Sequence, residues 1–196
     1  SEHEQEAIEK IVEFGRQLVS QGHLELLSLI ESVNVERLKP SLMAPMMQLQ
    51  GDILLMLGRF EQASSIFETA TAAAKEAKLP VVYSEILGSQ ADIAMKQGQT
   101  DKALAAHKEA LEVQVELGDA KGAARSYNNM GYLYRRKNDR TKALEAYSEV
   151  EAILSGDESL LGAQIILGRA LLDLGEVERA RKHAFEAFER ADKAED

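Results

Sequence analysis

The chain lacks cysteine and tryptophan, and it has only three prolines among its 196 residues. Without cysteine it can form neither disulfides nor a thiol-based catalytic site, and such a composition fits a reducing compartment. No apolar run approaches the roughly 18 residues that a membrane-spanning helix needs, and no basic and apolar leader stands at the start. We therefore expect a cytoplasmic protein without a membrane partner.

Positive charge is also scarce. Lys and Arg number 23 against 33 Asp and Glu, which leaves a formal net charge of −10. Proteins that bind nucleic acids neutralise backbone phosphates with Lys and Arg. The overall charge therefore excludes nucleic acid as the expected partner.

What the chain does contain is a repeat that runs through its whole length. Small residues recur at intervals of 36, 40, 40 and 37 positions, at Gly15, Gly51, Ala91, Gly131 and Gly168. Seven positions after each of these stands Gly22, Gly58, Gly98, Asn138 or Gly175. Such a period is typical of repeat arrays, in which no single repeat buries its apolar face alone. We therefore predict one domain, 1–196, with five repeats at 4–36, 40–78, 80–118, 119–155 and 157–194.

The repeat at 119–155 illustrates the structure expected of each period. Asp119 is suited to cap a first helix, along which apolar and small residues follow in steps of three and four. Asn138 replaces the glycine of the other repeats, and both residue types tolerate the left-handed conformation just past a helix C-terminus. A second amphipathic run then ends near Ser155 and Gly156. Each period is thus a helix, a tight turn and an antiparallel helix, which predicts an all-α fold of about ten helices.

Proline and aspartate mark the expected starts of the first helices. Pro40 and Pro80 stand where a helix begins, since the N–H that proline lacks would be unpaired there. Asp119 and Asp157 suit the same end of a helix electrostatically. Pro45 falls further into its helix, so we expect that helix to start late or to kink.

The slots of the repeat carry a resemblance to a known family. The repeat has five recurring slots: a small residue, an apolar or aromatic residue, a turn residue, an alanine and an aromatic residue. In the second repeat these slots hold Gly51, Leu54, Gly58, Ala63 and Phe67, and in the fourth they hold Gly131, Tyr134, Asn138, Ala143 and Tyr147. This pattern resembles the tetratricopeptide repeat (TPR) family, and the 40-residue spacing is similar to its long-repeat branch, which includes kinesin light chain and Pins-type adaptors. The tryptophan slot of the family departs from the pattern and holds Ile11, Met47, Leu87, Tyr127 and Gln164. The resemblance implies a right-handed α-solenoid that binds proteins or peptides and is not an enzyme.

One segment breaks the acidic character of the chain. Residues 120–142 contain seven basic residues and a single acidic one, Asp139. The TPR resemblance implies that the first helix of each repeat lines a concave groove. When this is carried onto the sequence, the groove positions of the fourth repeat are Arg125, Asn128, Asn129, Tyr132, Arg135 and Arg136. Arg169 of the fifth repeat extends this cationic strip.

The chemistry of these residues favours an extended acidic peptide. Arg offers a fork of donors that matches a carboxylate, and Asn can pair with both the N–H and the C=O of a peptide backbone. In the resembling polarity adaptors, an Asn at the Asn129 slot contacts the ligand backbone and an Arg at the Arg125 slot pairs with an acidic side chain. The alternative is that the arginines form ion pairs within the stack, with Glu85, Asp92 or Asp173.

Other residues point to no second chemistry. His3, His23, His107 and His183 lack metal-ligand spacing. His107 occupies the aromatic slot of Phe67 and Tyr147, so we expect it to pack between helices. No phosphate-binding loop or catalytic motif is present. We therefore expect no enzyme activity, no cofactor and no metal.

The last helix leaves an alternative open. Alanines follow one side of residues 177–194, while Phe185 and Val177 lie off that stripe. Since repeat arrays usually need a polar capping helix, an uncapped end predicts a homo-oligomer formed through the C-terminal helix. The chain would then be a self-associating assembly element. A third hypothesis is a ligand-sensing fragment of a larger regulator.

Overall fold

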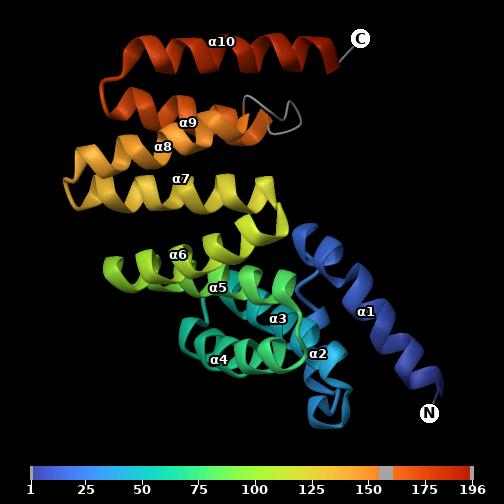
Figure 1. Cartoon of the computed structure of the whole chain (residues 1–196). Helices are drawn as coiled ribbons and strands as arrows, with labels where there is room; N and C mark the ends of the chain where they lie inside the picture. Colours follow the sequence, from blue (N-terminus) through green and yellow to red (C-terminus); the bar gives the residue numbers. More distant parts are fainter. Residues whose placement is uncertain (1, 155–160, 195–196) are drawn as a thin grey trace. The chain divides into compact units, whose positions relative to one another are not determined.

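The computed structural model describes residues 2–154 and 161–194 (Figure 1). Its contacts divide the chain into two compact units, unit 1 (Ser1–Gln99) and unit 2 (Thr100–Asp196), and each is described by itself. The division falls inside the third predicted repeat, 80–118. One continuous domain over 1–196, with the five repeat boundaries given above, stays a prediction.

Unit 1 is built from α-helices joined by short turns. Its elements are α1 (Glu2–Ser20), α2 (Leu26–Glu31), the 3-10 helix η1 (Val35–Arg37), α3 (Pro40–Met56), α4 (Phe60–Glu76) and α5 (Pro80–Lys96). Helices α3 and α4 form the closest pair, and α5 packs on both of them. Helix α1 packs on α3 (Figure 1).

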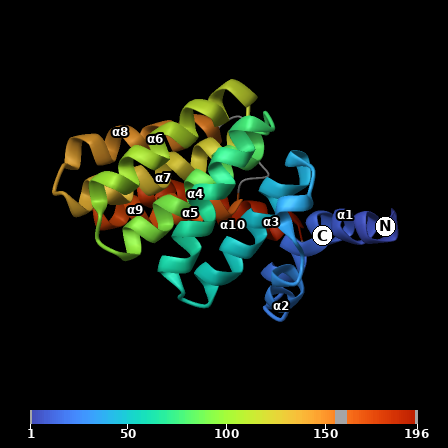
Figure 2. The ribbon, with the colours of Figure 1, turned by 90° about the horizontal axis from the view of Figure 1, so that it is seen from below.

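Unit 2 continues the same pattern of paired helices. Its elements are α6 (Thr100–Leu117), α7 (Ala120–Arg136), α8 (Arg140–Leu154), α9 (Leu161–Asp173) and α10 (Val177–Ala194). Helices α7 and α8 form one pair and α9 and α10 the next (Figure 1), and Figure 2 gives the same helices in a view turned by 90°. Across the described residues the secondary structure is helical, without strands. The predicted all-α architecture of stacked helix pairs is therefore confirmed.

The turns inside the repeats use left-handed residues, as the sequence predicts. Asn138 has φ +58° and the glycine at the same slot of the second repeat, Gly58, has φ +74°. After Asn138, the N–H of Asp139 donates to the carbonyl of Tyr134 at 2.9 Å, which closes the helix end. Lys78, which precedes α5, also has a positive φ, of +54°. No sequence signal marked that position, because lysine has no preference for this conformation.

The small residue of the repeat receives an aromatic ring from the partner helix. A Cβ added to Gly51 would lie 2.7 Å from Cζ of Phe67, and one added to Gly131 would lie 2.7 Å from Cζ of Tyr147. Both rings are fully buried. At Gly51 and Gly131, the two helices of the pair approach closely because the first helix carries no side chain there.

The helix starts agree with most of the sequence signals. Pro40 and Pro80 stand in the first turns of α3 and α5. Oδ1 of Asp119 accepts a hydrogen bond from the N–H of Gly122 at 2.9 Å, which caps α7. The late start expected from Pro45 is wrong, because α3 begins at Pro40 and includes Pro45. Asp157 and the predicted stop at 155–156 lie outside the described residues.

Candidate functional site

Helix α7 has two chemically different faces. Its buried side chains are small or apolar: Ala123, Ala124, Ser126, Met130 and Leu133, together with the close contact at Gly131. Ser126 donates a hydrogen bond of 2.8 Å to Gln114 of α6, so its hydroxyl is satisfied inside unit 2. The opposite face carries the predicted groove residues. Because residues three and four apart share a helix face, this placement follows from the spacing alone.

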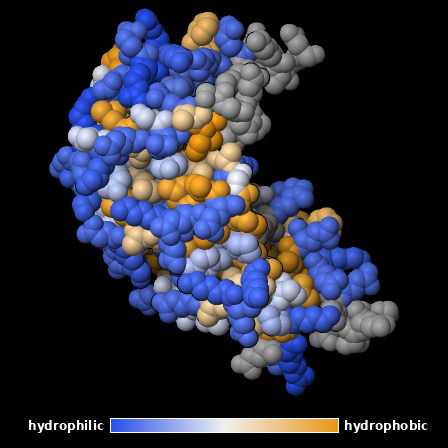
Figure 3. All heavy atoms as spheres, viewed as in Figure 1, coloured by the Kyte–Doolittle hydropathy of each residue, from blue (hydrophilic) through white to orange (hydrophobic). Residues whose placement is uncertain are grey.

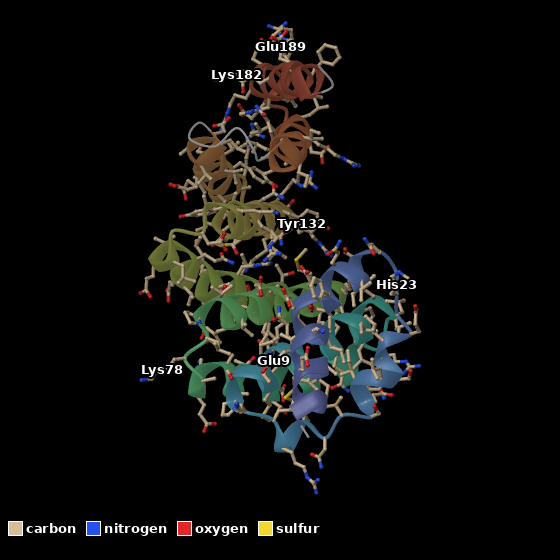
Figure 4. The ribbon with its side chains drawn as sticks, turned by 90° about the vertical axis from the view of Figure 1, so that its right-hand side faces the viewer. Glu9, His23, Lys78, Tyr132, Lys182 and Glu189 are labelled. Carbon is tan, nitrogen blue, oxygen red and sulfur yellow. The ribbon has the colours of Figure 1, made fainter. Side chains whose placement is uncertain are left out.

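The structure brings six of the seven predicted site residues together on this cationic face of α7. Arg125 and Arg136 are exposed, whereas Asn128, Asn129, Tyr132 and Arg135 are half-buried. We call this set the α7 face: Arg125, Asn128, Asn129, Tyr132, Arg135 and Arg136. Figure 4 shows nitrogen-bearing side chains gathered beside Tyr132.

Tyr132 organises the C-terminal half of the α7 face. The guanidinium carbons of Arg135 and Arg136 lie 5.5 and 5.9 Å from the centre of its ring. Both distances are within the range of cation–π contacts, which contribute roughly 0.5–1 kcal/mol at exposed sites. The ring therefore restricts two arginine side chains to one side of the helix.

Asn128 presents an unsatisfied acceptor. Its Oδ1 atom is buried and has no hydrogen-bond partner among the residues that the structure describes. A buried acceptor without a donor costs about 1–3 kcal/mol.

Arg125 lies close enough to His107 of α6 to act on its charge. The pKa of His107 is lowered to about 4, first because burial disfavours the charged ring and second because Arg125 is positive. No ion pair of Arg125 or of Arg136 occurs within the described part of unit 2. These two guanidinium groups remain available to an external carboxylate.

Four of the other five cations of the 120–142 segment, namely Arg135, Lys137, Arg140 and Lys142, are held by acidic residues of unit 2. Arg135 pairs with Asp173 of α9, as the alternative reading of the sequence allowed. Lys137 pairs with Asp101 at 2.5 Å and Arg140 with Glu176 at 2.6 Å. Both of these pairs join residues 36 positions apart, about one repeat period, which is a signal that the sequence already carried.

Arg169 is the one predicted site residue that lies outside α7. It lies on α9, 37 positions after Tyr132, and lines a groove between α9 and α10. Most residues of that groove are apolar, and Arg169 is one of its two cations, together with Arg181. Whether it extends the α7 strip toward a ligand stays a prediction.

In unit 1, the positions equivalent to the α7 face hold other types of side chain. Gln48 of α3 donates to Glu85 of α5 at 3.2 Å, and Ser89 donates to Asp52 at 2.9 Å. Polar side chains there bond to one another along the helix faces. In α5, the positions that correspond to Arg125 and Asn129 are therefore held by Glu85 and Ser89.

The described residues provide no site for a metal ion. No group of three or more His, Asp or Glu side chains in that part of the chain could hold one. His107 is packed in the interior, as its repeat slot predicts. His183 is also buried and contacts Glu151 at 2.9 Å, where Arg179 binds the same carboxylate.

A family model described as tetratricopeptide repeat matches residues 83–155. This segment of the chain therefore matches the tetratricopeptide repeat family. The match includes α7, α8 and the whole α7 face, and the helix pairs with left-handed turns are the architecture of this family. The TPR resemblance drawn from the sequence is therefore confirmed.

Solved structures with TPR-like folds are similar to the chain along nearly all of its length. A putative kinesin light chain from Podosopora anserina is 16% identical with a TM-score of 0.72, and the alignment covers 96% of each chain. BtubC (BKLC) from P. vanneervenii is 20% identical with a TM-score of 0.71, covering 97% of this chain and 80% of that one.

A third similar TPR-like structure is the Rap conjugation gene regulator of the plasmid pLS20, in complex with the Phr* peptide. It is 17% identical with a TM-score of 0.70, over 93% of this chain and 52% of that chain. This chain thus spans about half the length of the regulator. No curated protein matches the sequence. None of the helices in the described part of the chain has the length and hydropathy of a membrane span.

Proposed function

We propose that this protein is a non-enzymatic interaction scaffold that binds an extended, acidic peptide segment of a protein partner on the α7 face. The observation that carries the proposal is the pair of unneutralised guanidinium groups, Arg125 and Arg136, at the two ends of that face. In a chain of net charge −10, two such guanidinium groups on one helix face favour an anionic ligand.

The polar groups between the two arginines suit a peptide backbone. Asn128 and Asn129 are adjacent, half-buried residues that each carry a side-chain amide. An extended peptide exposes N–H and C=O groups that side-chain amides can pair with. In this arrangement the amides hold the backbone while Arg125 and Arg136 select acidic side chains.

The family supports the general form of this function. TPR-like folds serve as interaction scaffolds, and the similar Rap regulator was solved with a bound peptide. The acidic preference is a proposal from the chemistry of α7 alone. It requires Arg125 and Arg136 to gain more from carboxylates than they lose in hydration, as guanidinium–carboxylate pairs commonly do.

The test is a binding measurement on an array of extended peptides that carry Asp or Glu, each matched with its Asn or Gln counterpart. We expect the acidic members to bind more tightly. The Arg125→Glu variant should weaken binding at least tenfold, because each 1.4 kcal/mol of lost interaction changes the dissociation constant tenfold. Asn129→Ala should weaken the binding of acidic peptides and of their Asn or Gln counterparts alike, because the Asn129 side chain would contact the peptide backbone.

Lys108→Glu provides the matched control. It makes the same charge change at an exposed position of α6, outside the α7 face. We expect Lys108→Glu to leave affinity within twofold of wild type. If affinity survives both Arg125→Glu and Asn129→Ala, the α7 face is not the binding site.

A further inference from the structure

An open apolar groove runs between α9 and α10. Its volume is about 660 Å³, and its lining includes the large apolar residues Ile165, Leu172, Val177 and Phe188. The large side chains on its walls are more than half exposed, with Phe188 at 68%. Exposed aromatic area of this kind usually marks a contact surface. Apolar side chains appear among the hydrophilic ones at the α10 end of the chain in Figure 3.

The groove is the surface that another repeat would cover. In a repeat array each helix pair packs on the next, and α9 with α10 is the last pair described. The polar side chains of α10 lie on its other side, where Glu189 projects away from α9 (Figure 4). The occupant that fits this surface is the first helix of a further repeat.

The chain contains a first helix with a matching unpartnered stripe. In α1, Ile8, Gly15 and Val19 are buried in unit 1. Beside this buried face runs a second apolar row, Ala7, Ile11, Phe14 and Leu18, in steps of four, three and four residues. Phe14 in this row is 49% exposed.

The groove and the stripe are complementary in spacing and size. The α10 side of the groove includes Ala180, Ala184, Ala187 and Ala191, again in steps of four, three and four. Rows of this kind pack into one another at about 20° between helices, as in helix bundles. The large side chains of α1 would lie on the small residues of α10, which permits a close approach.

The charges are complementary as well. Arg169 and Arg181 stand at the groove, and the pair of Arg181 with Glu178 is highly exposed and therefore weak. Helix α1 carries exposed carboxylates at Glu6 and Glu13, and Glu6 also pairs with Lys10 at 3.1 Å.

We propose that the α9–α10 groove binds helix α1 of a second copy of this chain, which produces head-to-tail association. Such an interface joins two different surfaces, so it generates a ring or an open chain of copies rather than a closed symmetric dimer. This association uses neither Arg125 nor Asn129, so it is independent of peptide binding on the α7 face.

The test combines two variants of opposite design. Phe14→Lys places a cation opposite Arg169 and Arg181, and Phe188→Glu places an anion opposite the acidic α1. We expect light scattering behind a sizing column to show wild-type mass rising with concentration above the 21.6 kDa monomer. Each variant alone should remain a monomer, because each retains only one intact surface. An equimolar mixture should form a species of twice the monomer mass and nothing larger.

Val115→Glu is the control, since it adds the same charge at an exposed apolar position of α6 and should associate like wild type. Circular dichroism confirms that each variant is folded. Three outcomes would overturn the proposal: wild type that stays monomeric at millimolar concentration, a Phe14→Lys variant that still associates, or a mixture that contains only monomers. Association lost in Phe188→Glu alone would indicate a symmetric contact between two α10 helices.

Discussion

At the residue scale, His107 is a polar residue in a repeat slot where other repeats have a buried aromatic ring. It occupies the slot in which the other central repeats place Phe67 and Tyr147, and it is 2% exposed. Neither ring nitrogen has a hydrogen-bond partner among the described residues. Burial, with a smaller contribution from Arg125, lowers its pKa from 6.5 to about 4. The folded protein therefore holds a neutral imidazole that the unfolded chain protonates more readily.

We predict that His107→Leu stabilises the protein and flattens its pH dependence. Leucine has a similar volume and removes two unpaired polar atoms, each of which costs about 1–3 kcal/mol when buried. In wild type, the lowered pKa contributes stability that is complete above pH 6.5 and declines as pH falls from 6.5 toward 4. Urea unfolding should show that the free energy of unfolding falls less between pH 7 and pH 5 in the variant than in wild type.

The exposed His23, which pairs with Glu25, supplies the comparison for this experiment. His23→Gln should follow the wild-type pH dependence closely, because that position is on the surface. An identical loss of stability between pH 7 and pH 5 in wild type and His107→Leu would contradict a lowered pKa of His107.

At the scale of helix pairs, the absence of a side chain at one position decides how closely two helices approach. Gly131 of α7 meets the ring of Tyr147 of α8, and Gly51 of α3 meets Phe67 of α4 with the same geometry. Gly168 of α9 differs, because its nearest neighbour is the carbonyl oxygen of Ala180, 3.5 Å from an added Cβ. The same repeat slot is therefore tightly filled in one pair and has room in another.

We predict opposite effects of one substitution at these two glycines. Gly131→Ala should destabilise the protein by about 1–3 kcal/mol, since the added methyl group forces the buried Tyr147 ring to move. Gly168→Ala should be neutral or stabilise it by up to roughly 1 kcal/mol, because alanine favours a helix interior. Thermal or urea unfolding measures both, and equal effects at the two positions would contradict this packing.

Helix ends were predictable because their chemistry is local. The left-handed φ of Asn138 and the cap at Asp119 depend on the residue itself and its nearest neighbours. Pro45 and Lys78 were not predictable in the same way. Helix α3 includes Pro45, and the turn before α5 places Lys78 at a positive φ, because contacts outside the segment outweigh the local preference of each residue.

At the scale of the whole molecule, the division into two units predicts how stability is distributed. In a repeat array each repeat contacts only its neighbours, so a local defect reaches distant repeats weakly. We predict that Gly131→Ala lowers the hydrogen-exchange protection of amides in α7 and α8 more than in α3 and α4. Mass spectrometry of exchanged peptides measures this for each helix. Uniform loss in both units would indicate one cooperative domain over 1–196.

The sequence by itself determined the repeat period, the helix pairs, their turns and the face on which the cations of α7 lie. These features follow from spacing along the chain, which a helix converts directly into direction. Only the tertiary structure decided which cations are neutralised. Arg135 meets Asp173 and Arg140 meets Glu176, whereas Arg125 and Arg136 meet no carboxylate in the described part of unit 2. Such pairings depend on how one helix pair packs on the next, and no local pattern encodes that distance.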